Sequence, residues 1–251
     1  MRNIQKYVLI IPICLFFCSC NSGVKEFNKQ GMQYLQKGLS AEAIIKFNSA
    51  IRLNSEWLGA YFNRAIAYSN LKKYNDAIQD LNYVINNCPD NAEALFNRAI
   101  IYENIGANSQ AIKDYSKTIK LRPDFIMAYH YRGILRFKIN DLNGALLDYN
   151  KALDLGLDVS MSIARAKEFG LNSSALYFNR GVVYQKLGDI KSAIKDYNKS
   201  LEIDPSNART YYNVGIAYIQ NGEILHAIKL LNIASKLGFT KADTILSNIH
   251  R

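Results

Sequence analysis

AEALFNRAIIYENIGANSQAIKDYSKTIKLRPDF, residues 92–125, is one complete copy of a pattern that recurs along the chain. Its first half carries Leu95 and Ala99 at helical spacing, and its second half carries Ala111 and Tyr115 in the same way. Such spacing places each set on one face of an α-helix. The proline near the end of the stretch stops the second helix. The stretch therefore predicts two short amphipathic helices joined by a turn.

Alanines set the period of this pattern. Successive members of the series are 34, 34, 34, 48 and 34 residues apart. The same frame holds a small residue at position 8, mostly aromatic residues at positions 4, 11 and 24, and proline at position 32 in three copies. The alanines, counted as position 20, are Ala43, Ala77, Ala111, Ala145, Ala193 and Ala227.

A 34-residue period with these positions resembles the tetratricopeptide repeat (TPR) family over residues 24–251. The resemblance implies an all-α fold, a right-handed α-solenoid of six helix-turn-helix units. No unit can bury its apolar face alone, so neighbouring units stack. Twelve of the 17 tyrosines fall at positions 4, 11 or 24, which favours packing over a sugar-binding platform.

Arginine and aspartate occur together within the repeats. Position 7 is arginine and position 23 is aspartate in units two to five, and both are absent from units one and six. We expect four salt bridges within repeats, worth about 0–1 kcal/mol each where exposed. A charged binding stripe is the alternative. The pairs are Arg64 and Asp80, Arg98 and Asp114, Arg132 and Asp148, and Arg180 and Asp196.

The 48-residue interval contains an insertion of 14 residues. We expect an inserted helix and junction over residues 158–173, with a bend near Gly170, and a capping helix over residues 240–251. The capping helix would begin at a Thr-x-x-Asp box and place Ala242, Ile245 and Leu246 on one face. The predicted solenoid is thus units 1–4 over residues 24–157 and units 5–6 over residues 174–239.

The N-terminus predicts export. A basic start and an apolar run from Tyr7 to Phe17 are typical of a signal peptide, and the run is too short to cross a bilayer as a helix. Ser19 before Cys20 resembles a lipobox, which implies a signal peptide over residues 1–19, lipidation of Cys20 and a tether over residues 20–23. Soluble secretion and an uncleaved anchor are the alternatives. Because Asn21 is no retention aspartate, we expect the outer membrane, facing the periplasm of a double-membrane bacterium.

Catalysis has no support in the sequence. The three histidines fall in different units, without nucleophile or metal-ligand partners at useful spacing. No glycine-rich phosphate loop occurs. Four cysteines are too few for a disulfide scaffold. We therefore expect no enzyme, no cofactor and no metal site.

A binding site is predicted in the concave groove that the resemblance implies. Side-chain amides both donate and accept hydrogen bonds, so an asparagine row can hold the backbone of an extended peptide. The row resembles the asparagine ladder of the protein O-GlcNAc transferases, although asparagine is also close to the TPR consensus at that position. The candidate residues are, at position 6, Asn63, Asn97, Asn179 and Asn213 and, at position 5, Phe62, Phe96, Phe178 and Tyr212.

These features predict a non-catalytic scaffold or adaptor for protein–protein interaction at the cell envelope, similar in layout to TPR lipoproteins. Its partner would be another protein or a peptide segment, with a membrane contact through the lipid and with no nucleic acid. Aromatic residues at position 5 exclude the carboxylate clamp of chaperone-binding TPRs. The formal charge is +10 for the full chain. Removal of the signal peptide with Arg2 and Lys6 lowers it to +8, which favours acidic partners or anionic lipid. A glycan- or cell-wall-binding module and a structural spacer are the alternatives.

Overall fold

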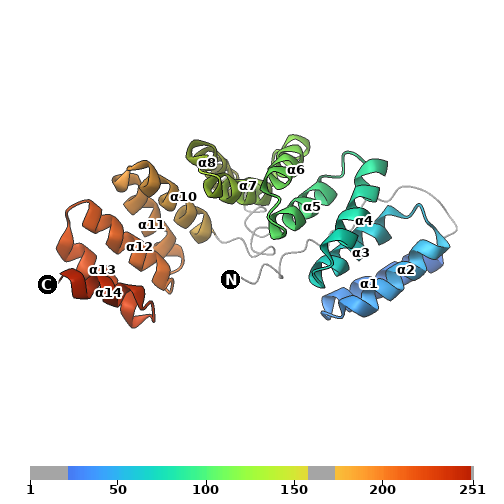
Figure 1. Ribbon diagram of the computed structural model, residues 1–251, viewed down its shortest axis with the longest axis horizontal. Helices are drawn as coiled ribbons and strands as arrows, with labels where there is room; N and C mark the ends of the chain where they lie inside the picture. The colour runs from blue at the N-terminus through green and yellow to red at the C-terminus, as the bar shows by residue number, and fades with distance from the viewer. Residues whose placement is uncertain (1–21, 158–172, 250–251) are drawn as a thin grey trace. The chain divides into compact units, whose positions relative to one another are not determined.

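The computed structural model describes residues 22–157 and 173–249, and every regular element in these ranges is an α-helix (Figure 1). Residues 1–21, with the predicted signal peptide and Cys20, lie outside the described residues. So does the whole of the predicted inserted helix, with all of its junction except residue 173. The helices are α1 (Ser22–Gln36), α2 (Ser40–Leu53), α3 (Leu58–Asn70), α4 (Tyr74–Asn87), α5 (Ala92–Asn104), α6 (Asn108–Leu121), α7 (Ile126–Lys138), α8 (Leu142–Leu157), α10 (Ser173–Leu187), α11 (Ile190–Ile203), α12 (Ala208–Gln220), α13 (Ile224–Lys236) and α14 (Lys241–Ile249).

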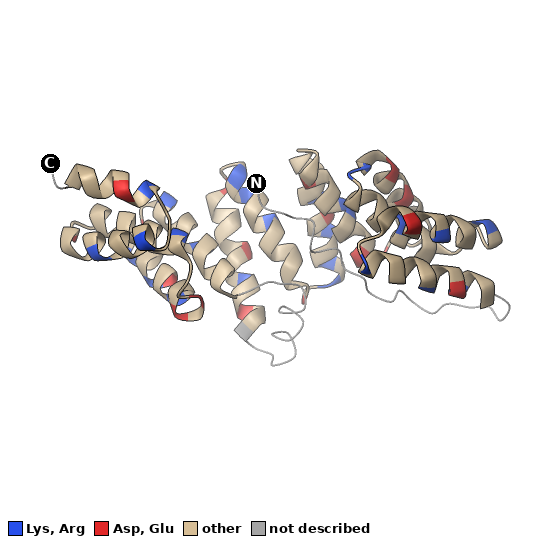
Figure 2. Cartoon of the chain, turned by 90° about the horizontal axis from the view of Figure 1, so that it is seen from below, with Lys and Arg blue, Asp and Glu red and all other residues tan. Residues whose placement is uncertain are grey.

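The helices pack as six consecutive pairs, which confirms the predicted all-α repeat fold. The pairs are α1–α2, α3–α4, α5–α6, α7–α8, α10–α11 and α12–α13. The chain divides into two compact units, Met1–Phe125 and Ile126–Arg251. Within each unit, the second helix of a pair also packs against the first helix of the next pair. Basic and acidic residues are distributed over the helices of both units (Figure 2).

In four of the pairs a glycine on the first helix faces a large side chain on the second. Gly181 of α10 lies so close to Tyr197 of α11 that a Cβ at Gly181 would stand 2.8 Å from the tyrosine ring. Tyr115 and Tyr197 are fully buried, and Tyr149 is 2% exposed. Burial raises the pKa of the Tyr197 phenol. The predicted packing role of the position-24 tyrosines is therefore confirmed.

Proline is not needed to end the second helix. Helix α4 ends at Asn87, two residues before Pro89, as expected. Helix α2 ends at the same register, at Leu53, although Ser55 stands in place of proline. Helix α8 also lacks the proline and runs on to Leu157, two positions further than α4. The turn into the next repeat therefore depends on packing as well as on proline.

The turn between the two helices of a pair uses one left-handed residue, which the sequence analysis did not identify. It stands at position 15 in all six repeats, with φ between 59° and 84°. Glycine adopts this conformation without steric cost, whereas other residues do not. Four repeats carry glycine there and the other two do not; the residues are Gly38, Lys72, Gly106, Asn140, Gly188 and Gly222.

The repeats on either side of the insertion stack directly, and the expected bend stays a prediction. Helices α8 and α10 pack directly against each other on either side of residues 158–172, as consecutive repeats do elsewhere. Arg180 of α10 donates from Nη1 to the Oδ1 of Asn150 in α8 at 2.8 Å. The insertion lies within the second compact unit, Ile126–Arg251.

The two ends of the described chain follow the prediction with small shifts. Helix α14 covers the last repeat, and the buried Ala242 packs with Ile245 and Leu246 against α13, which confirms the capping helix. Helix α1 begins at Ser22, inside the predicted tether.

Replacement of Lys72 by glycine should stabilise the fold. Lys72 holds φ at 59°, so Lys72→Gly should raise the free energy of unfolding by about 0.5–1 kcal/mol. Asn140→Gly should give a smaller gain, because asparagine tolerates the left-handed region. Urea unfolding followed by far-ultraviolet circular dichroism measures both. Gly106→Ala is the reverse control and should destabilise, and a stabilising Gly106→Ala would contradict the role of this turn.

Candidate functional site

An arginine on the first helix of four repeats holds an aspartate on the second helix with two hydrogen bonds. In each case Nε and Nη2 of the guanidinium donate to the two carboxylate oxygens. The distances for Arg98 and Asp114 are 2.7 and 2.8 Å, and those for Arg180 and Asp196 are 2.6 and 2.8 Å. The four predicted salt bridges are confirmed.

The third guanidinium nitrogen reaches back to the preceding repeat. Nη1 of Arg64 donates to Asn48 at 2.6 Å, and Nη1 of Arg98 donates to Asn82 at 2.6 Å. The acceptors stand at position 25 of the earlier repeat. Each of these arginines therefore joins both helices of its own repeat to the second helix of the repeat before it. We call this arrangement, arginine at position 7 with aspartate at 23 and asparagine at 25, the arginine clamp.

Aromatic rings complete the clamp. The Cζ of Arg64 lies 5.3 Å from the ring centroid of Tyr61 and 5.7 Å from that of Tyr68. Arg180 has the same relation to the tyrosines at positions 4 and 11 of its own helix, at 5.6 and 5.8 Å. A cation at this distance from an aromatic face is attracted to it. Tyrosines at positions 4 and 11 and arginine at position 7 therefore lie on one helix face, where the rings attract the guanidinium.

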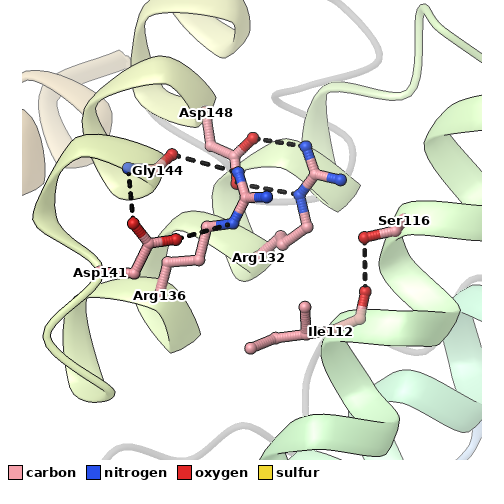
Figure 3. Close-up of polar contacts among 7 residues, drawn as sticks. All are labelled: Ile112, Ser116, Arg132, Arg136, Asp141, Gly144 and Asp148. Carbon is pink, nitrogen blue, oxygen red and sulfur yellow. Dashed lines mark hydrogen bonds and ion pairs between the residues drawn. The ribbon is translucent and has the colours of Figure 1, made fainter.

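The fourth repeat carries a variant of the clamp (Figure 3). Arg136 replaces tyrosine at position 11 and donates to Oδ2 of Asp148 at 2.9 Å, so Asp148 accepts from two arginines. Arg136 also donates to the carbonyl of Gly144 and lies 3.5 Å from Asp141. In the third repeat, position 25 is Ser116, which donates to the Ile112 carbonyl of its own helix at 2.7 Å.

The clamp charges serve the framework. Hydrogen bonds to Asp114 and Asp196 raise the pKa of the Arg98 and Arg180 guanidinium groups. Both aspartates are buried. A carboxylate that is buried and doubly hydrogen-bonded to arginine is not available to a ligand. These contacts favour the framework over the alternative of a charged binding stripe.

The side chains of the predicted asparagine row are hydrogen-bonded within the chain in the first compact unit, Met1–Phe125, but not in the second, Ile126–Arg251. Nδ2 of Asn63 donates to Oδ1 of Asn28 at 3.0 Å, and Nδ2 of Asn97 donates to the carbonyl of Glu93 at 2.9 Å. Asn179 and Asn213 are partly exposed, and their side-chain amides make no hydrogen bond within the part of the chain that the structure describes. Their amides are therefore the ones available to a partner.

The predicted aromatic row is mostly core. Phe62 and Phe96 are fully buried, and Phe178 is 6% exposed. Tyr212 is partly exposed, and its ring lies 4.9 Å from that of Phe239. Phe62 and Phe96 are thus inaccessible to a ligand, and their predicted role in binding is wrong. The reason is that position 5 lies at the edge of the buried helix face.

A hollow of about 300 Å³ lies on the face of α1, and the sequence analysis did not identify it. Its lining is amide-rich and basic around an apolar part formed by a methionine and the only tryptophan. The possible signal was the tryptophan itself, which stands at position 34, where two repeats carry asparagine. The lining residues are Lys25, Asn28, Lys29, Met32, Gln33, Gln36 and Trp57.

Neither a metal-ligand cluster nor a membrane-spanning helix occurs among the described residues. Within 22–157 and 173–249, no group of three or more histidine, cysteine, aspartate or glutamate side chains is placed to hold a metal ion. No helix of these ranges is both long and apolar enough to cross a membrane.

Comparison with known families identifies the repeats. Three tetratricopeptide repeat models match residues 60–91, residues 92–125 and 174–207, and residues 196–229. The chain therefore contains tetratricopeptide repeats, as its period predicts. No curated protein matches it significantly.

Solved structures of TPR proteins have the same fold. MamA is 25% identical, with a TM-score of 0.63 over 75% of this chain and 96% of MamA. YrrB, described as a TPR protein with an unusual peptide-binding site, is 19% identical, with a TM-score of 0.64 over 76% of this chain and 92% of YrrB. A chain of the APC/C hetero-tetramer Cut9–Hcn1 is 17% identical, with a TM-score of 0.65 over 90% of this chain and 42% of the other.

Removal of one clamp partner should cost more than removal of both. Asp114→Ala leaves the half-buried Arg98 guanidinium without its carboxylate and should lower the free energy of unfolding by about 3 kcal/mol. The pair Arg98→Met with Asp114→Leu should cost less, because apolar residues of similar size replace both charges. Urea unfolding of the three proteins gives the comparison.

The exposed pair of Lys199 and Glu202 provides the control, and Glu202→Ala should change stability little. A double variant less stable than Asp114→Ala would contradict the role assigned to the clamp.

Proposed function

We propose that the chain is a non-catalytic protein-interaction scaffold at the bacterial cell envelope, exported and anchored through a lipid on Cys20. Its partner is an extended peptide segment that lies along the first helices of the repeats, with Asn179 and Asn213 as contacts. The TPR fold supports the interaction role, because TPR scaffolds mediate protein–protein interaction.

The open amides of the second unit carry this proposal. Asn179 of α10 and Asn213 of α12 stand at the same position of consecutive repeats, and neither amide has a hydrogen-bond partner among the described residues. Arg209 stands one turn before Asn213, and its Cζ lies 5.1 Å from the ring centroid of Phe178. Two amides and a cation held by a ring make a surface suited to peptide carbonyls and to a carboxylate.

The free energy of binding requires contacts in addition to the two amides. Up to four hydrogen bonds from two amide groups contribute about 2–6 kcal/mol. A 1 μM complex requires about 8 kcal/mol. Arg209 and the exposed part of Tyr212 lie on the same first helix and are the residues we expect to supply the difference.

The membrane part of the proposal rests on the N-terminal sequence and on where the fold begins. The lipobox resemblance places the mature N-terminus at Cys20, and α1 begins at Ser22. A lipid on Cys20 would therefore hold α1 against the membrane surface, since only Asn21 separates them.

A photo-crosslinking residue in place of Ile216, one turn after Asn213, should capture the partner. The same residue in place of Lys195, on an outward-facing helix, should not.

Asn179→Ala with Asn213→Ala should weaken partner binding at least tenfold, because the peptide backbone loses its amide partners. Asn97→Ala is the matched control, since the Asn97 amide already bonds to its own helix.

Isothermal titration with the captured segment measures the affinities. Equal affinity for the double variant and the wild-type protein would exclude the amides as contacts.

Lipidation at Cys20 is tested separately. Cys20→Ser should abolish labelling by an alkyne fatty acid in cells and should release the protein from washed membranes. Cys18→Ser is the control and should keep both label and membrane attachment. Continued labelling of the Cys20→Ser protein would contradict lipidation at this residue.

A further inference from the structure

The outward faces of the second helices differ between the two compact units. Positions 18, 22 and 26 follow one line along each second helix, because residues four apart share a helix face. In units four to six this gives nine side chains on α8, α11 and α13, and all nine are exposed. Five are lysine, three are aliphatic and none is acidic. We call them the lysine grid: Asn143, Leu147, Lys151, Lys191, Lys195, Lys199, Leu225, Lys229 and Ile233.

The grid occupies equivalent positions of three consecutive repeats. Helix α10 packs against both α8 and α11, and α12 packs against both α11 and α13, so the three helices follow one another in the stack. Equivalent positions of stacked repeats therefore share a face. The corresponding nine positions of α2, α4 and α6 carry only two lysines, Lys113 and Lys117.

The charge of the grid is largely uncompensated. Lys199 forms an ion pair with Glu202 at 2.6 Å. The other four lysines form no ion pair within the described ranges 22–157 and 173–249. The aliphatic members are open to solvent, with Leu147 69% exposed and Leu225 77% exposed. Lysine stems and exposed leucines thus form one apolar layer beneath a layer of ammonium groups.

We propose that the lysine grid is a docking surface for an anionic lipid bilayer. The ammonium groups would contact lipid phosphates, while Leu147 and Leu225 would enter the boundary between headgroups and acyl chains. The interspersed leucines favour lipid over nucleic acid or an acidic protein segment, because a bilayer offers both negative charge and an apolar layer. This inference rests on the proposed location at a membrane and adds a second contact to the lipid on Cys20.

Vesicle binding tests the grid without the lipid anchor. The mature chain from residue 20, with Cys20→Ser, is mixed with vesicles of phosphatidylcholine containing 30% phosphatidylglycerol, and with pure phosphatidylcholine as reference. It should cosediment with the anionic vesicles alone, and less so at high salt. Lys191→Gln with Lys195→Gln and Lys229→Gln should lower partitioning about a hundredfold, at roughly fivefold for each lysine near the surface.

Matched variants separate the grid from net charge. Lys113→Gln with Lys117→Gln and Lys120→Gln removes the same charge from α6 and should change partitioning less than about threefold. Leu147→Gln with Leu225→Gln keeps the charge and should lower partitioning by about tenfold.

Equal losses for the two triple variants, equal binding to both vesicle types, or no vesicle binding would overturn the proposal. So would retention on polyglutamate without binding to anionic vesicles. Groove variants at Asn179 and Asn213 should keep vesicle binding, so this test and the peptide test fail independently.

Discussion

The arginine clamp is the interaction on which the rest of the structure depends. A single guanidinium has five donors in a rigid plane. In repeats two, three and five, three of its nitrogens have partners on two repeats. It thereby fixes both the closure of its own helix pair and the approach of the preceding one. This explains how the stack tolerates 14 additional residues: Arg180 reaches Asn150 across them, so α8 and α10 keep the contact that consecutive repeats make. The last repeat lacks the clamp and instead packs Leu231 and Ala234 against α14.

The clamp also determines which surfaces remain for binding. Positions 4, 7 and 11 of the first helix and position 23 of the second are committed to it, and positions 8, 20 and 24 form the tight contact within the pair. Two surfaces are left over: the partly exposed Asn179, Asn213 and Tyr212 on first helices of the second compact unit, and positions 18, 22 and 26 of the second helices. Because they lie on different helices, a peptide on one and a bilayer on the other do not compete. The repeat can therefore vary its outer residues, as between α6 and α11, without disturbing its core.

The periodic part of the fold was predictable from sequence, and the boundaries of the faces were not. The period gave the helix pairs, the buried tyrosines and the four ion pairs, because each of these recurs at a fixed spacing. The aromatic residues at position 5 were wrongly assigned to the groove. At the edge of a helix face, sequence spacing alone does not distinguish a core residue from a groove residue. Burial of Phe62 and Phe96 decides between the two only in three dimensions. The break in the period was taken for a bend, but α8 and α10 still pack together, because additional residues between two repeats do not by themselves break the stacking.

The fourth repeat shows how the clamp changes without loss of its function. Tyrosine at position 11 is replaced by Arg136, which would place two guanidinium groups side by side without compensation. Asp148 accepts from both, and Asp141 lies 3.5 Å from Arg136 on the other side. Asp141 stands at position 16, just after the left-handed Asn140, and its Oδ1 also accepts from the amide of Gly144 at the start of α8. One carboxylate thus balances the additional charge and caps a helix, so the loss of a stacking ring is offset by a local electrostatic network.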